Sequence, residues 1–228
     1  MRHLLLFVVA AAGCGSGKHS VSDANTSADS TSEIDAAGCQ PMVLLAGGTD
    51  IGLQGWATVM QGPASLTYGT GDVQLETSTA SNATTSGQLL LTRSSAVDPG
   101  TPFKFQVEML VESVNPHNQL DSAAAIMASF TPPFGLGTER SQMIYLDAGK
   151  VGWADDTQSF TVPVTNSAFH IYELSVDANK VAHVSVDGVQ ALTRAGFVEN
   201  GVIAIGDQTN EPNIDSVLRI RSVTKLCP

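Results

Sequence analysis

The amino-acid sequence predicts an all-β protein whose residues 39–228 form a two-sheet, antiparallel jelly-roll β-sandwich. Apolar and polar residues alternate in several short stretches, which is the period-two pattern of half-buried strands. Gly, Pro and Asp residues with turn chemistry separate these stretches, and no stretch beyond the N-terminal region keeps helical periodicity for three turns. Many short strands joined by frequent turns are typical of sandwiches and jelly rolls.

The composition supports one substantial folded domain. The chain has 228 residues, of which 43% are hydrophobic and 14% charged, so wholesale disorder is not expected. Its formal net charge is −11 and its basic residues form no stripe, which argues against nucleic acid as a partner. The same acidity leaves divalent cations among the partners to consider.

Residues 1–13 predict an export signal. Arg2 precedes an apolar stretch, residues 4–12, that is too short to span a bilayer as a mature helix. The sequence Ala-Ala-Gly-Cys that follows resembles the lipobox of bacterial lipoprotein signal peptides, although Ala11 stands where Leu is commonest. The resemblance implies that Cys14 becomes the first residue and that its thiol receives diacylglycerol. The alternative is an ordinary secretory signal in which Cys14 has no special role.

Residues 14–38 predict a flexible tether. They are mostly Gly, Ser, Thr, Ala, Asp and Asn, with almost nothing to bury. Such a segment has an r.m.s. reach of roughly 27 Å, enough to hold a domain just off a membrane. Gly15 follows Cys14, which resembles the sorting pattern for the outer membrane. We therefore expect an exported protein of the bacterial cell envelope, an outer-membrane lipoprotein that contacts the membrane only through its lipid.

The strands of the domain follow in order. Residues 103–112 place apolar side chains on one face, namely Phe103, Phe105, Val107, Met109 and Val111, and polar ones on the other. Residues 170–186 predict a hairpin with a turn at 177–180, and Asp187-Gly188 predicts a tight turn into a third strand. Further strands are expected near residues 124–130, 142–147, 151–153, 160–164, 201–205 and 217–225.

These segments carry a family resemblance. Ser-Val-Asp-Gly at 185–188, the hairpin before it, GVIAIGDQTN at 201–210 and DSVLRIRSV at 215–223 resemble the C-terminal half of concanavalin A-like lectin/glucanase and laminin-G-like domains. GLQGWATV at 52–59, which contains Trp56, resembles the first-strand region of the same superfamily. The resemblance covers roughly residues 45–226. It implies two stacked, curved antiparallel sheets in which the last strand lies near the first.

That implied topology bears on the cysteines. Cys39 and Cys227 lie just outside the predicted first and last strands, so in an oxidising compartment a disulfide between them would join the two ends of the domain. The alternatives are two free thiols, or a bridge from one of them to Cys14 if that residue is not lipidated. No Cys or His spacing typical of a zinc site is present.

The sequence does not predict an enzyme. Glycosidases of this superfamily carry Glu-x-Asp-x-Glu on one strand, and the domain lacks that motif. Glu108 and Glu112 share a strand face, but their Cα atoms would be roughly 13 Å apart, which is wider than the carboxylate separations that cleave glycosides. They are interpreted as a solvated strand face. The motifs HExxH and GxSxG are also absent.

The candidate binding residues are aromatic, amide and acidic. Tyr145 and Trp153 lie on neighbouring predicted strands and are candidates to stack on a sugar ring. The alternative is that Trp153 is simply a core residue. Asn118 and Asp121, in the loop after Val114, are candidates to bind its hydroxyls. Calcium is the cofactor that the resemblance allows, with oxygen donors in or beside loops at Asp121, Asp147, Asp155, Asp156, Asp207 and Asp215. Turn formation is the favoured explanation of each of these aspartates.

The sequence therefore favours an exported, lipid-anchored, non-catalytic surface binding module with carbohydrate as its ligand. The alternative is a structural or protein-interaction surface lipoprotein, and a glycoside hydrolase with an altered motif ranks third. The fold alone does not decide between these three classes, because one architecture hosts many functions.

Overall fold

The computed structural model describes residues 39–77 and 87–228, which form strands almost throughout. The predicted signal, Cys14 and the predicted tether up to residue 38 lie outside the described residues. The helical content of these described residues is one short α-helix, α1 (Gly137–Ser141), and one 3-10 turn, η1 (Gly52–Gln54). Neither helical segment reaches the length and apolarity that a membrane crossing needs.

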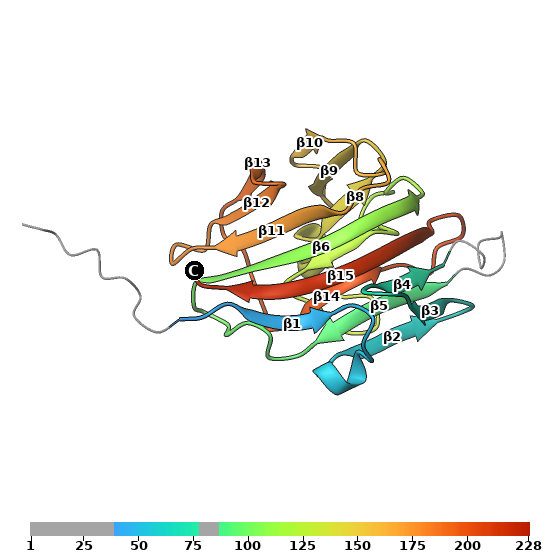
Figure 1. Cartoon of the computed structure of the whole chain (residues 1–228). Helices are drawn as coiled ribbons and strands as arrows, with labels where there is room; N and C mark the ends of the chain where they lie inside the picture. Colours follow the sequence, from blue (N-terminus) through green and yellow to red (C-terminus); the bar gives the residue numbers. More distant parts are fainter. Residues whose placement is uncertain (1–38, 78–86) are drawn as a thin grey trace, which may run out of the picture. The chain divides into compact units, whose positions relative to one another are not determined.

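Two antiparallel sheets form the two layers of the molecule (Figure 1). Sheet A has the strand order β13 (Val189–Arg194), β12 (Ala182–Val186), β11 (His170–Val176), β6 (Phe103–Val114), β15 (Ser216–Leu226), β4 (Val73–Glu76) and β3 (Ser65–Tyr68), with β1 (Met42–Ala46) also paired to β15. Sheet B has the order β10 (Ser159–Thr161), β9 (Lys150–Trp153), β8 (Ile144–Asp147), β7 (Ala125–Met127), β14 (Ile203–Asp207), β5 (Gln88–Arg93) and β2 (Ala57–Gln61). The prediction of an all-β, two-sheet antiparallel sandwich is confirmed.

The core lies between the sheets and is built from the alternation that the sequence displays. Phe103, Phe105 and Val107 of β6 are buried, and so are Tyr172 and Leu174 of the paired strand β11. Sheet B contributes the alternate residues of its central strands to the same cluster. Burial of a large aliphatic or aromatic side chain contributes about 1.5–3 kcal/mol, so this shared layer holds the two sheets together.

The two ends of the domain meet, as the sequence implied. β1 pairs with the last strand, β15, in the register Met42 to Lys225 and Ala46 to Ser222. Cys39 and Cys227, just outside these strands, form a disulfide with their Cα atoms 5.8 Å apart. The predicted bridge is therefore confirmed.

The first-strand region differs from the expectation in one respect. Trp56 lies between η1 and β2, and the first strand is the earlier segment β1. The Trp56 indole is buried and donates to the backbone carbonyl of Leu44 over 2.7 Å. Trp56 therefore packs against the first strand, β1, and is not part of it.

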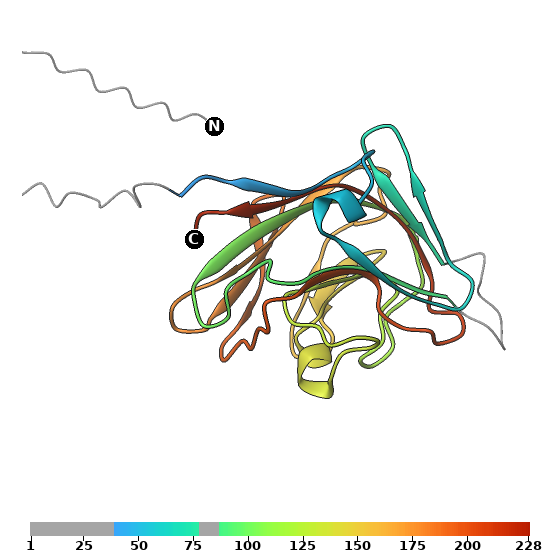
Figure 2. The same cartoon turned by 90° about the horizontal axis from the view of Figure 1, so that it is seen from below.

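A strap, defined as residues 129–142 and including α1, covers the outer face of sheet B. In Figure 2 the part of the strap with α1 lies on the side of the molecule opposite to β1, β6 and β15. Gln88 donates to the carbonyl of Pro133 over 2.7 Å, and Gln208 donates to that of Phe134 over 2.8 Å. A second buried apolar cluster forms beneath the strap from Leu90, Ala125, Met127, Phe130, Met143, Ala154 and Ala204.

Candidate functional site

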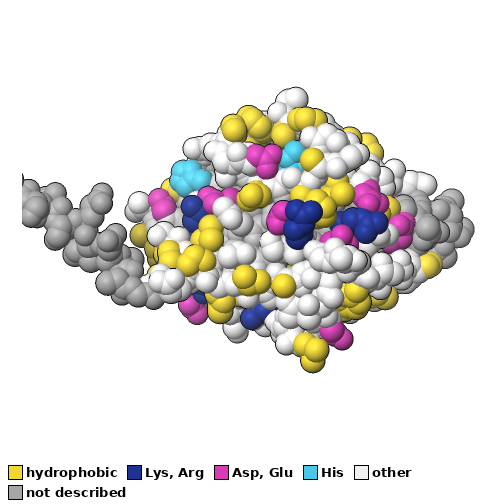
Figure 3. Space-filling view, in the orientation of Figure 1, with side chains coloured by type: hydrophobic (Ala, Val, Ile, Leu, Met, Phe, Trp, Pro, Cys, Tyr) yellow, Lys and Arg dark blue, Asp and Glu magenta, His cyan; other side chains and the backbone are white. Residues whose placement is uncertain are grey.

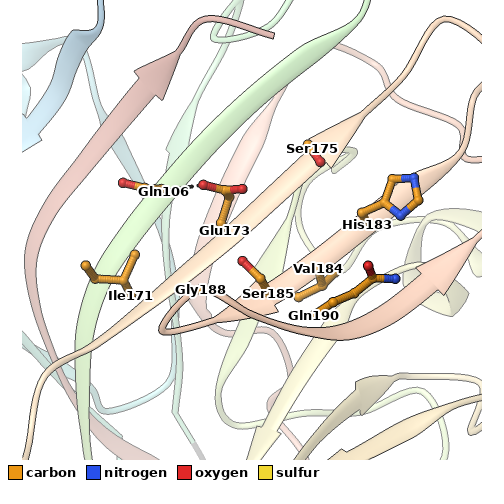
Figure 4. A pocket seen from close by; sticks show the side chains of 9 residues that line it. All are labelled: Gln106, Ile171, Glu173, Ser175, His183, Val184, Ser185, Gly188 and Gln190. Carbon is orange, nitrogen blue, oxygen red and sulfur yellow. Dashed lines mark hydrogen bonds between the residues drawn. The ribbon is translucent and has the colours of Figure 1, made fainter. Parts of the chain in front are cut away.

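The open face of the sandwich is the outer face of sheet A. The strap packs over the central strands of sheet B, whereas the polar residues of β6, β11 and β12 on the outer face of sheet A stay partly exposed. A hollow of about 250 Å³ lies on this face over β6, β11, β12 and β13. We call it the sheet A hollow; it is lined by Gln106, Ile171, Glu173, Ser175, His183, Val184, Ser185, Gly188 and Gln190 (Figure 4).

Strand register explains why these residues gather. Directly paired positions form one transverse row across four strands, Gln106, Glu173, Ser185 and Gln190. A second row lies beside it, formed by Lys104, Ser175, His183 and Thr193. Each row contains one short serine between longer side chains, and the serines therefore make the floor where the others make the walls.

The hollow offers both donors and acceptors of hydrogen bonds. Gln106 donates to Glu173 over 2.7 Å, as the dashed line in Figure 4 shows. The hydroxyls of Ser175 and Ser185 and the ring nitrogens of His183 have no hydrogen-bond partner among residues 39–77 and 87–228. A ligand with hydroxyl groups would satisfy these side chains, since each of them can exchange hydrogen bonds with a hydroxyl.

Ion pairs lie beside the hollow on the sheet A face. Lys104 lies 3.0 Å from Glu173, and Arg221 lies 2.5 Å from Glu108. Arg219 is paired with Glu112 on the same face. Figure 3 shows these charges as adjacent basic and acidic side chains over β6 and β15. Glu108 and Glu112 therefore each have an arginine of their own, in agreement with their interpretation as a charged strand face.

The two predicted stacking residues are buried, which corrects the sequence-based assignment. The Tyr145 side chain is 0% exposed because His117 stacks on its ring at a centroid distance of 4.0 Å. Burial also raises the pKa of the Tyr145 hydroxyl. Trp153 is likewise 0% exposed, and Arg194 lies over its indole. Neither ring offers a face to a ligand in this structure.

The two predicted polar partners lie together in one turn. Asn118 and Asp121 close a tight turn through two backbone hydrogen bonds of 3.0 Å. Asp121 forms an ion pair with Arg140 of the strap. It lines a second, smaller hollow of about 230 Å³, which we call the loop pocket, together with Phe134, Arg140, Thr209, Asn210 and Glu211. Asn118 is not among the residues that line this pocket.

The candidate calcium ligands do not form a metal site among the described residues. No group of three or more His, Cys, Asp or Glu side chains there is arranged to hold a metal ion. Asp121 and Asp155 are paired with arginines, and Asp147 accepts a hydrogen bond from the backbone of His117 over 2.8 Å. The side chains present therefore fit structural roles better than a calcium cage, which needs six to eight oxygen ligands.

One of these aspartates is fully enclosed. Asp207, at the end of β14, is 1% exposed, and burial raises the pKa of its carboxyl well above the usual range, against the hydrogen bonds from Thr77 and Thr209. Negative charge at Asp215 and Asp121 acts in the same direction. The burial of this carboxyl is not visible in the sequence, because an aspartate after a strand is ordinary in a turn.

The hollow residues were also missed by sequence reasoning. Serine, glutamine and glutamate at alternate positions are what any solvated strand face shows. Their grouping depends on which strands pair and in which register, and this information is not local to any segment. A pairing of the segment 170–176 with 103–109 would have been the signal to search for.

Comparisons with known proteins agree on the fold. No family model and no curated protein sequence matches the chain. Among solved structures, the chain is similar to the carbohydrate esterase of the Shiga toxin-encoding bacteriophage phi24B, with a TM-score of 0.54 and 15% identity over 83% of this chain and 100% of the other. It is also similar to the VIP36 exoplasmic/lumenal domain in a Ca²⁺/Man-bound form, with a TM-score of 0.52 and 11% identity over 75% of this chain and 82% of the other.

A third similar structure is the cellulose induced protein Cip1, with a TM-score of 0.52 and 10% identity over 79% of this chain and 96% of the other. The fold is that of the concanavalin A-like lectins and glucanases. At these identities the likeness establishes the jelly-roll architecture, and the concanavalin A-like frame hosts both binding and hydrolytic proteins. What this chain does has to be argued from its own surface.

Proposed function

We propose that the protein is a non-catalytic carbohydrate-binding module and that the sheet A hollow is its binding site. The observation that carries the proposal is the set of unpaired polar groups, Ser175, Ser185 and His183, in a hollow of about 250 Å³ on the open sheet face. Carbohydrate hydroxyls are both donors and acceptors, as these groups are. The fold of the chain is shared with a mannose-bound lectin domain, which supports the same ligand class.

The content of the hollow argues against glycoside hydrolysis at this site. Hydrolysis of this kind normally uses two carboxyl groups, about 5–9.5 Å apart depending on the mechanism. The hollow is lined by a single carboxylate, Glu173, whose two oxygens are engaged by Lys104 and Gln106. A carboxylate so occupied serves to hold its neighbours in place and to accept from a ligand hydroxyl.

We further propose that the domain is exported and attached to the bacterial outer membrane through diacylglycerol on Cys14. The sequence of the first fourteen residues supports this, and so does the Cys39–Cys227 disulfide, since disulfides persist in oxidising compartments. Labelling of the expressed protein with a radioactive fatty acid tests the anchor. Label is expected on the wild type and not on Cys14→Ala, and an unlabelled wild type would contradict the proposal.

A structural or protein-interaction role is the second candidate. The regular ion pairs of Glu108 with Arg221 and of Glu112 with Arg219 favour it, because they cover the sheet A face with charges that need no ligand. This candidate predicts that a larger side chain in the hollow has no effect on binding to glycans.

A glycan array with the full chain, with and without added calcium, separates the two candidates. We expect retention on at least one glycan class by the wild type and loss of more than about nine-tenths of it in Ser175→Met, which fills the floor of the hollow. Ser65→Met is the matched control, since Ser65 is exposed on β3 of the same sheet. No retention on any glycan, or equal retention by Ser175→Met, would count against the proposed function.

A further inference from the structure

The lysines and arginines of the described residues are all engaged. Carboxylates lie within ion-pair distance of Lys104, Arg140, Lys150, Lys180, Arg194, Arg219, Arg221 and Lys225. The remaining one, Arg93, donates to the backbone carbonyls of Leu44 and Gln54 at 2.6 and 2.5 Å. Within residues 39–77 and 87–228, the surface therefore presents no lysine or arginine that lacks an acceptor.

The sheet A hollow shows the same balance locally. Its wall carries one acidic group, Glu173, and that group is neutralised by Lys104 at 3.0 Å in the adjacent row. The other lining side chains with polar atoms are Gln106, Ser175, His183, Ser185 and Gln190. No arginine lines the hollow, and bidentate arginine contacts are the usual means of holding a sulfate, phosphate or carboxylate.

An anionic ligand would meet two penalties in this hollow. It would have to compete with Glu173 for the ammonium of Lys104, leaving the glutamate without its counterion. It would also approach a chain whose formal net charge is −11. The ammonium of an amino sugar gains little at Glu173, because Lys104 already neutralises that carboxylate and would repel a second cation beside it.

From this balance we infer that the sheet A hollow selects uncharged glycans and discriminates against sulfated, phosphorylated, uronic-acid and amino-sugar polymers. This inference rests on the proposed function and specifies its ligand class. The row from Gln106 to Gln190 crosses four strands, and at about 4.8 Å between strands it runs roughly 14 Å. The hollow therefore binds a short stretch of a glycan. The hydroxyls of the glycan form hydrogen bonds with the amide and hydroxyl side chains of the hollow.

The test compares neutral and charged polymers that share a backbone. Dextran, dextran sulfate and diethylaminoethyl-dextran form one such set, and cellulose, cellulose sulfate and chitosan form another. Together with an array of neutral and acidic oligosaccharides, these are presented to the full chain at 50 and 500 mM NaCl. We expect retention on the neutral members only. This retention should change less than twofold between the two salt concentrations, because a neutral ligand has no charge for salt to screen.

The outcomes separate the inference from the proposed function. Retention on the charged members that equals or exceeds retention on the neutral ones would overturn the inference while leaving carbohydrate binding intact. Retention on no member at all would overturn the proposed function and the inference with it.

A charge variant tests the cause of the selectivity. Glu173→Gln keeps the shape of the hollow and releases Lys104, so its retention on dextran sulfate or cellulose sulfate is expected to rise at least fivefold over the wild type. Glu112→Gln is the matched control, because Glu112 lies on the same face outside the hollow. Its partner Arg219 retains a second ion pair in that variant, with Asp72 at 3.3 Å. An unchanged Glu173→Gln, or an equal rise in Glu112→Gln, would contradict the assigned role of the Lys104–Glu173 pair.

Discussion

The hydroxyl of Thr77 lies 2.6 Å from Oδ2 of Asp207 and joins the two sheets at one end of the sandwich. Thr77 follows β4 of sheet A, and Asp207 is the last residue of β14 in sheet B. The same hydroxyl accepts the backbone N–H of Ser216 over 2.9 Å. A buried hydroxyl and carboxyl thus replace apolar packing at this position. The stability that the two groups contribute depends on the protonation of Asp207.

We expect Asp207→Asn to be more stable than the wild type at neutral pH. The pKa of Asp207 is raised in the folded state, so its contribution to stability is fully present below the unfolded value of about 3.9 and is lost as the pH rises through the folded pKa. The asparagine does not ionise, and the difference should grow by about 1.4 kcal/mol for each pH unit between the two pKa values. Urea unfolding of both proteins from pH 4 to pH 8 measures it.

Asp98→Asn controls for the loss of one negative charge, because the Asp98 side chain is 80% exposed. It should leave the pH dependence of the wild type unchanged. If Asp207→Asn were less stable than the wild type at every pH, the carboxylate form would be the stabilising one and the burial argument would be wrong.

Gly152 is expected to be irreplaceable even by alanine. It pairs with Tyr145 across β8 and β9, and a Cβ at this position would lie 2.6 Å from the Cζ and hydroxyl oxygen of the buried tyrosine ring. Overpacking of this kind costs about 1–3 kcal/mol. Thermal unfolding of Gly152→Ala should show that loss, whereas Gly149→Ala, which meets no atom within 4 Å, should melt with the wild type. Equal melting of the two variants would mean that Tyr145 is not fixed as described.

The disulfide should account for much of the stability of the domain. Cys39 and Cys227 are 188 residues apart in sequence, and in the chain-entropy model closing such a loop stabilises by up to roughly 5 kcal/mol. The double variant Cys39→Ser, Cys227→Ser should therefore unfold at much lower urea concentration than the wild type. Reducing agent should lower the wild type to the same level and leave the double variant unaffected, and a wild type insensitive to reduction would contradict the prediction.

The sequence predicted the strands of sheet A better than the site. In β6 and β11 one face is buried and the other is wet, so the alternation from Phe103 to Val111 is visible along the chain and was interpreted correctly. β8 and β9 are covered on both faces, and nearly all of their residues are buried. Alternation disappears in such strands, because both sets of side chains meet protein.

The errors at the candidate site have the same physical origin. Tyr145 and Trp153 lie on neighbouring strands, as predicted, but His117 and Arg194, far along the chain, cover their rings. Conversely, Ser175 and His183 look ordinary along the chain and become neighbours only when β11 pairs with β12. Local patterns predict which segments are strands, whereas a site is made by contacts between distant segments.

Nuclear magnetic resonance of the His183 ring during titration with a neutral oligosaccharide tests the central claim most directly. The imidazole C–H signals of His183, together with the side-chain amide signals of Gln106 and Gln190, should shift in a saturable way, because these groups line the hollow. Signals from the loop pocket, such as the Asn210 amide, should not move. Saturable shifts at Asn210 with an unmoved His183 ring would place the binding site elsewhere and contradict the account.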